Sequence, residues 1–241
     1  MSRRDLDTKA KAYARPTIHD RETALSLEWY AGRIMDLTPK GSLLELGLGQ
    51  GAASLVLSGR YSPHLIVEGS GEVIRAFRQG GQWAQVQIVE ALFEEFEPEG
   101  RFDLVVMGFV LEHVDDPGLV LRRYRDFLSP GGSLYVVVPN SESLHRRLGQ
   151  AAGLLDDLNR LGPRDLEAGH KRYFNLKSIT KLLEESGLAV TRAEGLMLKP
   201  LTSAQLAALD LSEEVMTALF RVGQDLPELS NALFLQARSQ D

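Results

Sequence analysis

Residues 42–51, which read SLLELGLGQG, constrain the fold of this chain more than any other stretch. An apolar run broken only by Glu45 is followed by glycines at positions 47, 49 and 51. Short apolar runs of this kind are typical of buried strands in parallel sheets, and glycine lets the backbone turn tightly and approach a ligand closely. Because residues 52–57 then open a helix, the loop is predicted to lie at a strand-to-helix turn. In doubly wound folds this turn binds nucleotides.

Two kinds of nucleotide cofactor fit the glycine loop. Gly47, Gly49 and Ala52 satisfy the dinucleotide fingerprint G-x-G-x-x-G/A, and Glu68 lies at the spacing of the acid that holds a ribose. A pyrophosphate, however, is bound by backbone N–H groups and the positive end of a helix, which leaves Glu45 without a role. A cofactor that carries an ammonium group would use that acid. A nicotinamide-dependent oxidoreductase therefore stays open as an alternative.

The pattern E-x-G-x-G-x-G, which begins at Glu45, resembles motif I of class I S-adenosylmethionine (SAM) methyltransferases. Further segments follow in the order typical of that family. Residues 111–117, LEHVDDP, resemble the "LEH(V/I)-x-D-P" segment of the ubiquinone-biosynthesis-like group, residues 130–132 resemble its "PGG" turn, and residues 169–174, GHKRYF, resemble its "GH-x-R-x-F" segment. The resemblance covers roughly residues 40–193 together with the last strand.

The order of apolar runs predicts an α/β fold. Strands are expected at 43–46, 65–67, 86–89, 104–107, 134–138, 188–193 and 232–237, with helices at 72–79, 119–128 and 176–186 between them. Such alternation indicates a parallel sheet with helices on both faces. The resemblance implies a three-layer, Rossmann-like fold with a seven-stranded, mostly parallel sheet whose last strand runs antiparallel. It also implies that SAM lies above the carboxyl ends of the strands.

At 241 residues the chain is expected to form a single domain, 1–241. Within it we expect an N-terminal helical cap at 1–38, bent at Pro16, a lid-like insertion at 141–170 with a helix over 151–161, and a helical insertion at 196–229. Leu206, Leu209, Leu211, Val215 and Leu219 suggest a buried helical face in the last of these. That insertion adds either a wall to the pocket or the contact of a homodimer.

Composition excludes several classes of protein. There is no cysteine, so disulfides, thiolate metal sites and thiol nucleophiles are ruled out, and we expect no metal. A net charge of −6 argues against sequence-independent binding of nucleic acid. The charged N-terminus lacks the apolar region of a secretory signal, and no apolar run is long enough to cross a membrane. A cytoplasmic protein is expected.

The resemblance also implies which residues bind SAM. Glu45 would lie near the ammonium, Glu68 would accept the ribose hydroxyls, and Glu90, which replaces the more usual Asp, would contact the adenine. The expected cofactor-binding set is Glu45, Gly47, Gly49, Gly51, Glu68, Gly69, Glu90, Ala91, Leu92 and Met107. Met107 could equally be plain core, and Tyr13 and Trp29 could cover the site or simply pack.

His113 and His170 are the catalytic candidates. His113 follows the fourth strand, where the methyl group should be presented, and a neutral imidazole there could accept a proton from a hydroxyl nucleophile. The alternative for His113 is a packing or capping role, and for His170 a hydrogen bond that anchors its loop. A base is needed only where the nucleophile must lose a proton.

The acceptor is expected to be a small molecule methylated on O or N. Segment 145–172 has six Lys or Arg against four acids, which hints at an anionic substrate, although a solvated face explains the charges equally well. Val138-Pro139-Asn140-Ser141 does not resemble the motif with which amino-methylating nucleic-acid enzymes hold a flipped base. A protein that binds SAM but transfers nothing is the other alternative.

Overall fold

A seven-stranded sheet forms the centre of the computed structural model, which describes residues 6–7, 20–80 and 86–240. The strands are β1 Leu43–Leu46, β2 His64–Glu68, β3 Gln87–Glu90, β4 Phe102–Gly108, β5 Leu128–Pro139, β6 Leu188–Leu196 and β7 Ala232–Ser239. Their order across the sheet is β3-β2-β1-β4-β5-β7-β6, and β7 runs antiparallel to both of its neighbours. The expected mostly parallel sheet with an antiparallel last strand is confirmed.

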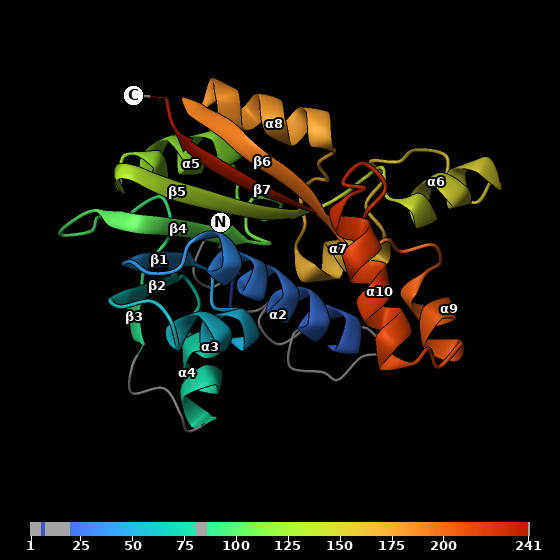
Figure 1. The fold of residues 1–241 in the computed structure, drawn as a ribbon, viewed down its shortest axis with the longest axis horizontal. Helices are drawn as coiled ribbons and strands as arrows, with labels where there is room; N and C mark the ends of the chain where they lie inside the picture. The colour runs from blue at the N-terminus through green and yellow to red at the C-terminus, as the bar shows by residue number, and fades with distance from the viewer. Residues whose placement is uncertain (1–5, 8–19, 81–85, 241) are drawn as a thin grey trace.

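Helices cover both faces of the sheet, as Figure 1 shows. One face carries α2 Asp20–Leu37, α3 Ala52–Ser58 and α4 Gly71–Gln79, and the other carries α5 Pro117–Arg125 and α8 Leu176–Glu185. The remaining helices, α6 Leu144–Ala151, α7 Pro163–Ala168, α9 Ser203–Ala208 and α10 Glu213–Gln224, gather beyond the end of the sheet that lies to the right in Figure 1.

Alternating residues of the strands supply two separate cores, because successive side chains of a strand point to opposite faces. On β4, Val105 and Met107 pack toward α5 and α8, whereas Leu104 and Val106 pack toward α2 and α3. All four side chains are fully buried. Each such burial stabilises the fold by ~1.5–3 kcal/mol relative to exposure of the side chain. The near-continuous apolar run of β4 thus follows from burial on both faces.

The helix predicted near the N-terminus is confirmed over 20–37. Tyr30 and Ile34 are buried on its sheet-facing side, and Leu27 and Leu37 pack against the same core. Trp29 packs on Phe220 of α10 with ring centroids 5.2 Å apart, so it has a packing role. The expected bend at Pro16 and the residue Tyr13 lie outside the described residues.

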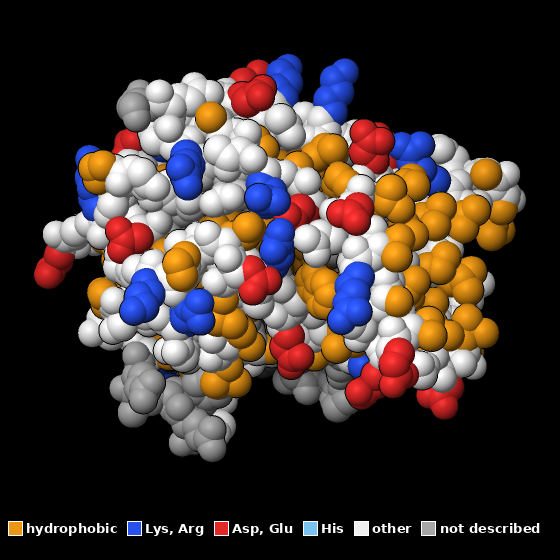
Figure 2. Space-filling model, in the orientation of Figure 1, with side chains coloured by type: hydrophobic (Ala, Val, Ile, Leu, Met, Phe, Trp, Pro, Cys, Tyr) orange, Lys and Arg blue, Asp and Glu red, His pale blue; other side chains and the backbone are white. Residues whose placement is uncertain are grey.

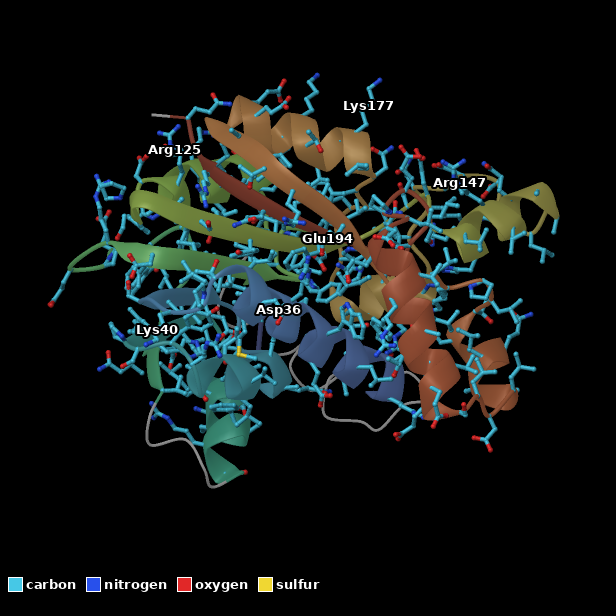
Figure 3. The ribbon with its side chains drawn as sticks, viewed as in Figure 1. Asp36, Lys40, Arg125, Arg147, Lys177 and Glu194 are labelled. Atoms are coloured by element: carbon cyan, nitrogen blue, oxygen red, sulfur yellow. The ribbon has the colours of Figure 1, made fainter. Side chains whose placement is uncertain are left out.

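An ion pair joins α2 to the far edge of the sheet. Glu194 of β6, labelled in Figure 3, accepts two hydrogen bonds of 2.8 Å from Arg33 of α2 and one of 2.9 Å from Arg192. Burial opposes the charge, but these guanidinium hydrogen bonds hold the pKa of Glu194 below its usual range. A bidentate arrangement of this kind is among the stronger charge-assisted contacts in proteins.

Three predicted boundaries are wrong. The insertion has helices over 144–151 and 163–168, whereas 152–161 is irregular, with turns and bends; helix α5 ends at Arg125 rather than at 128. The "PGG" residues lie inside β5, where the register shifts against β4. A Cβ on Gly132 would come within 2.9 Å of the carbonyl oxygen of Ser129 and 3.1 Å of that of Asp103, so the backbone needs glycine there.

The buried face predicted for 196–229 is wrong in part. Leu206 is buried, and Leu211 and Leu219 are partly buried, but Leu209 and Val215 are 56% and 45% exposed. The chain breaks into α9 and α10, and this break resets the helical period. The buried residues of α10 are Met216, Phe220 and Gly223. Exposed apolar side chains therefore lie on this end of the molecule, where Figure 2 shows hydrophobic atoms gathered.

Gly223 marks a very close approach between α10 and the backbone that follows β6. A Cβ at this position would lie 2.5 Å from the amide nitrogen of Leu198. We expect Gly223→Ala to lower the free energy of unfolding by ~1–3 kcal/mol, because overpacking against backbone outweighs the better helix propensity of alanine. Urea unfolding followed by circular dichroism measures this change.

Gly149 provides the matched control. It is also a helical glycine, but its Cβ would meet Leu155 at an ordinary 3.7 Å. Gly149→Ala should leave stability unchanged or raise it by up to ~1 kcal/mol. Equal effects of the two substitutions would contradict the close approach at Gly223.

Candidate functional site

The glycine loop lies between β1 and α3, as predicted. Gly47, Gly49 and Gly51 have φ values of 79°, 51° and 82°, the left-handed region that favours glycine. Gly51 also caps α3, and a Cβ on it would lie 2.2 Å from the Phe77 ring. A Cβ on Gly49 would meet nothing within 4 Å among the described residues. The loop is therefore packed at Gly51 and open at Gly49.

The carboxylate of Glu68 connects this loop with the loop that follows β2. It accepts hydrogen bonds from the backbone N–H of Leu48 at 3.0 Å and from that of Ser70 at 2.8 Å. Glu68 is only 8% exposed. Burial raises the pKa of the Glu68 carboxyl, backbone hydrogen bonds offset part of this rise, and the charge of Asp7 adds to it. The end of β2 is thus fixed beside the glycine loop.

A small cavity of about 60 Å³ opens at this edge of the sheet. Among its lining residues are five of the predicted ones, namely Glu68, Gly69, Ala91, Leu92 and His113. Ligand sites are usually several hundred Å³ in volume, so a nucleoside would have to displace part of the lining. Leu6 is the lining residue that a nucleoside would displace, because its Cδ1 fills the space beside Gly69, 2.5 Å from the position that a Cβ of Gly69 would take.

Asp7 holds this N-terminal segment in place. Its Oδ1 accepts hydrogen bonds from the hydroxyl of Ser70 at 2.6 Å and from the backbone N–H of Glu72 at 3.2 Å. Ser70 is the N-cap of α4 and Glu72 lies in its first turn, where anionic groups are stabilised by the helix dipole. The expected N-terminal cap therefore contributes to the site through Leu6 and Asp7.

Glu45 lies on the face of β1 that α3 covers. Its Oε1 accepts a hydrogen bond from Ser54 at 2.9 Å, and its Oε2 lies 2.8 Å from Nε2 of His64. All three side chains are buried. Together with burial of the phenol, the Glu45 carboxylate raises the pKa of Tyr30. These contacts give Glu45 an internal role, and a contact with a cofactor ammonium stays a prediction.

The other predicted cofactor residues occupy different surroundings. Glu90 is exposed at the end of β3, with its carboxylate beside Gly71. Met107 is fully buried in the core that faces α5 and α8. The structure thus brings together the ribose and adenine candidates Glu68, Gly69, Ala91 and Leu92, but it places Glu90 and Met107 outside the cavity lining.

His113 and His170 lie side by side, although their positions differ by 57 in the sequence (170 − 113). Their ring centroids are 4.7 Å apart in an edge-on arrangement. Nε2 of His113 is 4.0 Å from Oε1 of Glu112, and Nδ1 of His170 is 3.1 Å from Oδ1 of Asp165. Burial raises the pKa of Glu112 to about 7, against the opposing effect of His170. The two catalytic candidates therefore share one cluster.

The cations of segment 145–172 are largely used inside the protein. Arg146 donates to the carbonyl oxygens of Leu158 and Arg160, and its guanidinium lies 4.3 Å from the ring centre of Tyr173. Ion pairs or backbone carbonyls also engage Arg147, Arg160, Lys171 and Arg172. Their charge therefore gives no independent support to an anionic substrate.

Several residues at the site were not predicted from the sequence. Glu112 was part of the "LEH" segment and adjoins His113, but its burial could not be read from one sequence. Leu6, Asp7 and Asp165 act through contacts between distant segments. Only Ser70 carried a recognisable signal, because a serine before an apolar helical pattern is a typical N-cap, and its hydroxyl accepts from the N–H of Val73.

Comparison with known proteins defines the family. Residues 19–193 match a family model described as a methyltransferase domain. Because this range covers well over half of the chain, the chain belongs to the methyltransferase domain family.

Curated relatives match parts of the chain. An uncharacterised protein of Mycobacterium tuberculosis is 30% identical over 49% of this chain. A ubiquinone biosynthesis O-methyltransferase of Rhodopseudomonas palustris is 30% identical over 51%, and the mitochondrial one of mouse is 26% identical over 77%. The match spans only 43%, 47% and 50% of these three relatives, about half of their length.

Solved structures share the fold. The N-methyltransferase NodS of Bradyrhizobium japonicum in complex with S-adenosylhomocysteine superposes with a TM-score of 0.62 at 15% identity, over 97% of both chains. The 1,6-didemethyltoxoflavin-N1-methyltransferase of Burkholderia thailandensis gives 0.63 at 16% identity, over 99% of this chain and 87% of that one. Separately, the helices described here include none with the length and apolar character needed to span a bilayer.

The internal role of Glu45 can be measured as stability. We expect Glu45→Ala to lower the free energy of unfolding by at least ~1–3 kcal/mol, because it leaves the buried His64 and Ser54 groups without this partner. Chemical denaturation measures the change. Glu99→Ala, which removes an exposed acid, is the control and should be neutral. A neutral Glu45→Ala would show that these contacts stabilise nothing.

Proposed function

We propose that the chain transfers a methyl group from SAM to an oxygen or nitrogen atom of a small molecule. The observation that carries this proposal is the Glu68 carboxylate, which lies between the open glycine loop and the cavity lined by Gly69, Ala91 and Leu92. An acid at the end of the second strand, in a chain of the methyltransferase domain family, supports a ribose-binding role for Glu68.

The residues present fit the proposed cofactor. Gly49 leaves the loop open on one side, so a ligand can approach the backbone there. Glu68 would accept the ribose hydroxyls, and the backbone at Ala91 and Leu92 would border the adenine. The absence of a Cβ at Gly69 leaves the space that Leu6 now fills. Solved relatives support the cofactor, since NodS is bound to S-adenosylhomocysteine and DhpI to SAM.

Catalysis would depend mainly on alignment. SAM supplies a methyl group already activated by its sulfonium. The protein then has to hold the acceptor in line with it, and positioning of this kind is worth ~7–11 kcal/mol. His113 lines the cavity and is the candidate that would accept a proton from the acceptor, with an effect of typically ~10²–10⁴-fold. His170 would orient it through their edge-on contact.

The alternatives predict different binding. A protein of the same fold that binds SAM but transfers nothing would bind the cofactor and release no product with any acceptor. A nicotinamide-dependent oxidoreductase would bind NADH, and the family match argues against it. Four further points stay predictions: methylation on O or N, an anionic acceptor, a homodimer through the exposed apolar end at α9 and α10, and a cytoplasmic location.

Binding of S-adenosylhomocysteine tests the cofactor. Calorimetric titration should give micromolar affinity for the wild type, and Gly49→Val should weaken it at least ~10-fold, about 1.4 kcal/mol, because a branched side chain would fill the open side of the loop. Gly153→Val is the matched control, since Gly153 also has a positive φ and open space around it but lies in the insertion. No measurable binding of S-adenosylhomocysteine would overturn the proposal, and binding of NADH would favour the oxidoreductase.

The raised pKa of Glu68 predicts a pH dependence of cofactor binding. Only the ionised carboxylate accepts two ribose hydroxyls, and protonation removes that capacity as the pH falls through the pKa. Because burial raises this pKa, affinity for S-adenosylhomocysteine should begin to fall at a higher pH than the usual glutamate range allows. Titrations from neutral to acidic pH should show this fall. Glu68→Gln should bind more weakly and without this dependence; the same acid fall in the variant would contradict the assignment.

A further inference from the structure

Helix α10 has apolar side chains on two of its faces. One face, described above, is buried against the rest of the molecule. Val215, Ala218 and Val222 are exposed, and their spacing of three and four residues places them in one stripe along the helix. A surface helix normally has polar residues on its outer side. The exposed stripe of α10 therefore points to a further contact.

Other exposed apolar side chains lie on the elements around α10. Leu209 at the end of α9, Leu226 just after α10 and Leu148 of α6 are all exposed. Figure 2 shows hydrophobic atoms gathered over this end of the molecule, where Figure 1 places the three helices. Single exposed leucines are ordinary, whereas a gathering of them on one face is typical of a surface that binds a partner.

Two charged residues lie along one border of the exposed stripe. Glu214 is in the first turn of α10 and Arg221 is in its last turn, and both are exposed. Because they are about two helical turns apart, both side chains lie on the same side of the stripe. This border is therefore acidic at the start of the helix and basic at its end.

A second copy of α10 supplies the matching pattern when the two helices run antiparallel. A two-fold axis then places Val215 of one copy beside Ala218 of the other, and it places Glu214 of one copy beside Arg221 of the other. The charge pair forms twice, and the short side chain of Ala218 lets the two helices approach closely. A parallel arrangement brings equal ends of the helices together and forms neither charge pair.

We propose that the chain forms a homodimer in which the exposed stripes of two α10 helices pack antiparallel about a two-fold axis. The occupant of this face is a second copy, because the face is complementary to itself in both apolar spacing and charge. The described residues that line the cofactor cavity include none of α10, so the pairing leaves that cavity accessible. The proposal does not rest on methyl transfer.

Sedimentation velocity of the whole chain over a range of concentrations tests the dimer. The wild type should show a reversible equilibrium between monomer and dimer. Val222→Ser should raise the dissociation constant of the dimer ~10-fold or more, because it places a polar group in the apolar centre of the contact. Leu119→Ser is the matched control, since Leu119 is also an exposed apolar residue of a helix but lies on α5. It should leave association unchanged.

Charge reversal tests the antiparallel arrangement. Glu214→Arg and Arg221→Glu should each weaken association ~10-fold or more, because each variant places like charges opposite one another in both pairs. The double variant should recover the affinity of the wild type. An equimolar mixture of the two single variants should form a heterodimer that is tighter than either homodimer. Glu213→Arg makes the same change of charge at a neighbouring exposed position away from this border, and it should have no effect.

Several outcomes overturn the homodimer. A chain that stays monomeric at every concentration it tolerates does so, and so does a dimer that neither Val222→Ser nor the charge reversals weaken, because it uses another surface. A monomer that binds phosphatidylcholine vesicles, and loses this binding on Val222→Ser, assigns the face to a lipid surface instead. Circular dichroism checks that each variant is folded, and the recovery of the double variant distinguishes lost pairing from damage to α10.

Discussion

The candidate site depends on one buried carboxylate. Glu68 accepts hydrogen bonds from Leu48 in one loop and from Ser70 in the next, so a single side chain links the loops that follow β1 and β2. Parallel neighbours make this possible, because their carboxyl ends meet at one edge of the sheet. The amides that hold the acid offset part of the rise in its pKa that burial causes. A ligand that uses Glu68 thus binds a group whose position is already fixed.

The internal contacts of Glu45 and the candidate catalytic cluster lie at different places on the sheet. On the face of α2 and α3, Glu45 ties β1 to Ser54 of α3 and to His64 of β2. At the carboxyl edge, the turn after β4 and the segment before α8 bring Glu112, His113 and His170 together. These two buried acids differ in their contacts: Glu45 takes part in hydrogen bonds with Ser54 and His64, whereas Oε1 of Glu112 has a 4.0 Å ion-pair contact with His113.

The fold was predictable because its signals are local. Apolar runs gave all seven strands, and the glycine positions gave the turn before α3. Predictions failed where one sequence pattern has two structural solutions. Leu209 and Val215 fit a helical period that a break between α9 and α10 interrupts, and most of 151–161 is irregular where a helix was expected. Of the site, Glu68, Gly69, Ala91, Leu92 and His113 were found from motifs. Leu6, Glu112 and Asp165 were not, because their roles arise only from contacts between segments far apart in sequence.

The two N-terminal residues at the cavity have an energetic consequence for any ligand. Leu6 occupies the space beside Gly69, and Asp7 is bound to the first turn of α4. A nucleoside at this place competes with a segment of the chain itself, whose effective concentration is fixed by the covalent connection. Its apparent affinity is lower than its intrinsic affinity by the fraction of molecules in which the segment has left. A ligand at this place would therefore bind in competition with Leu6, and a change in how tightly Asp7 is held would alter its affinity without altering any contact to the ligand.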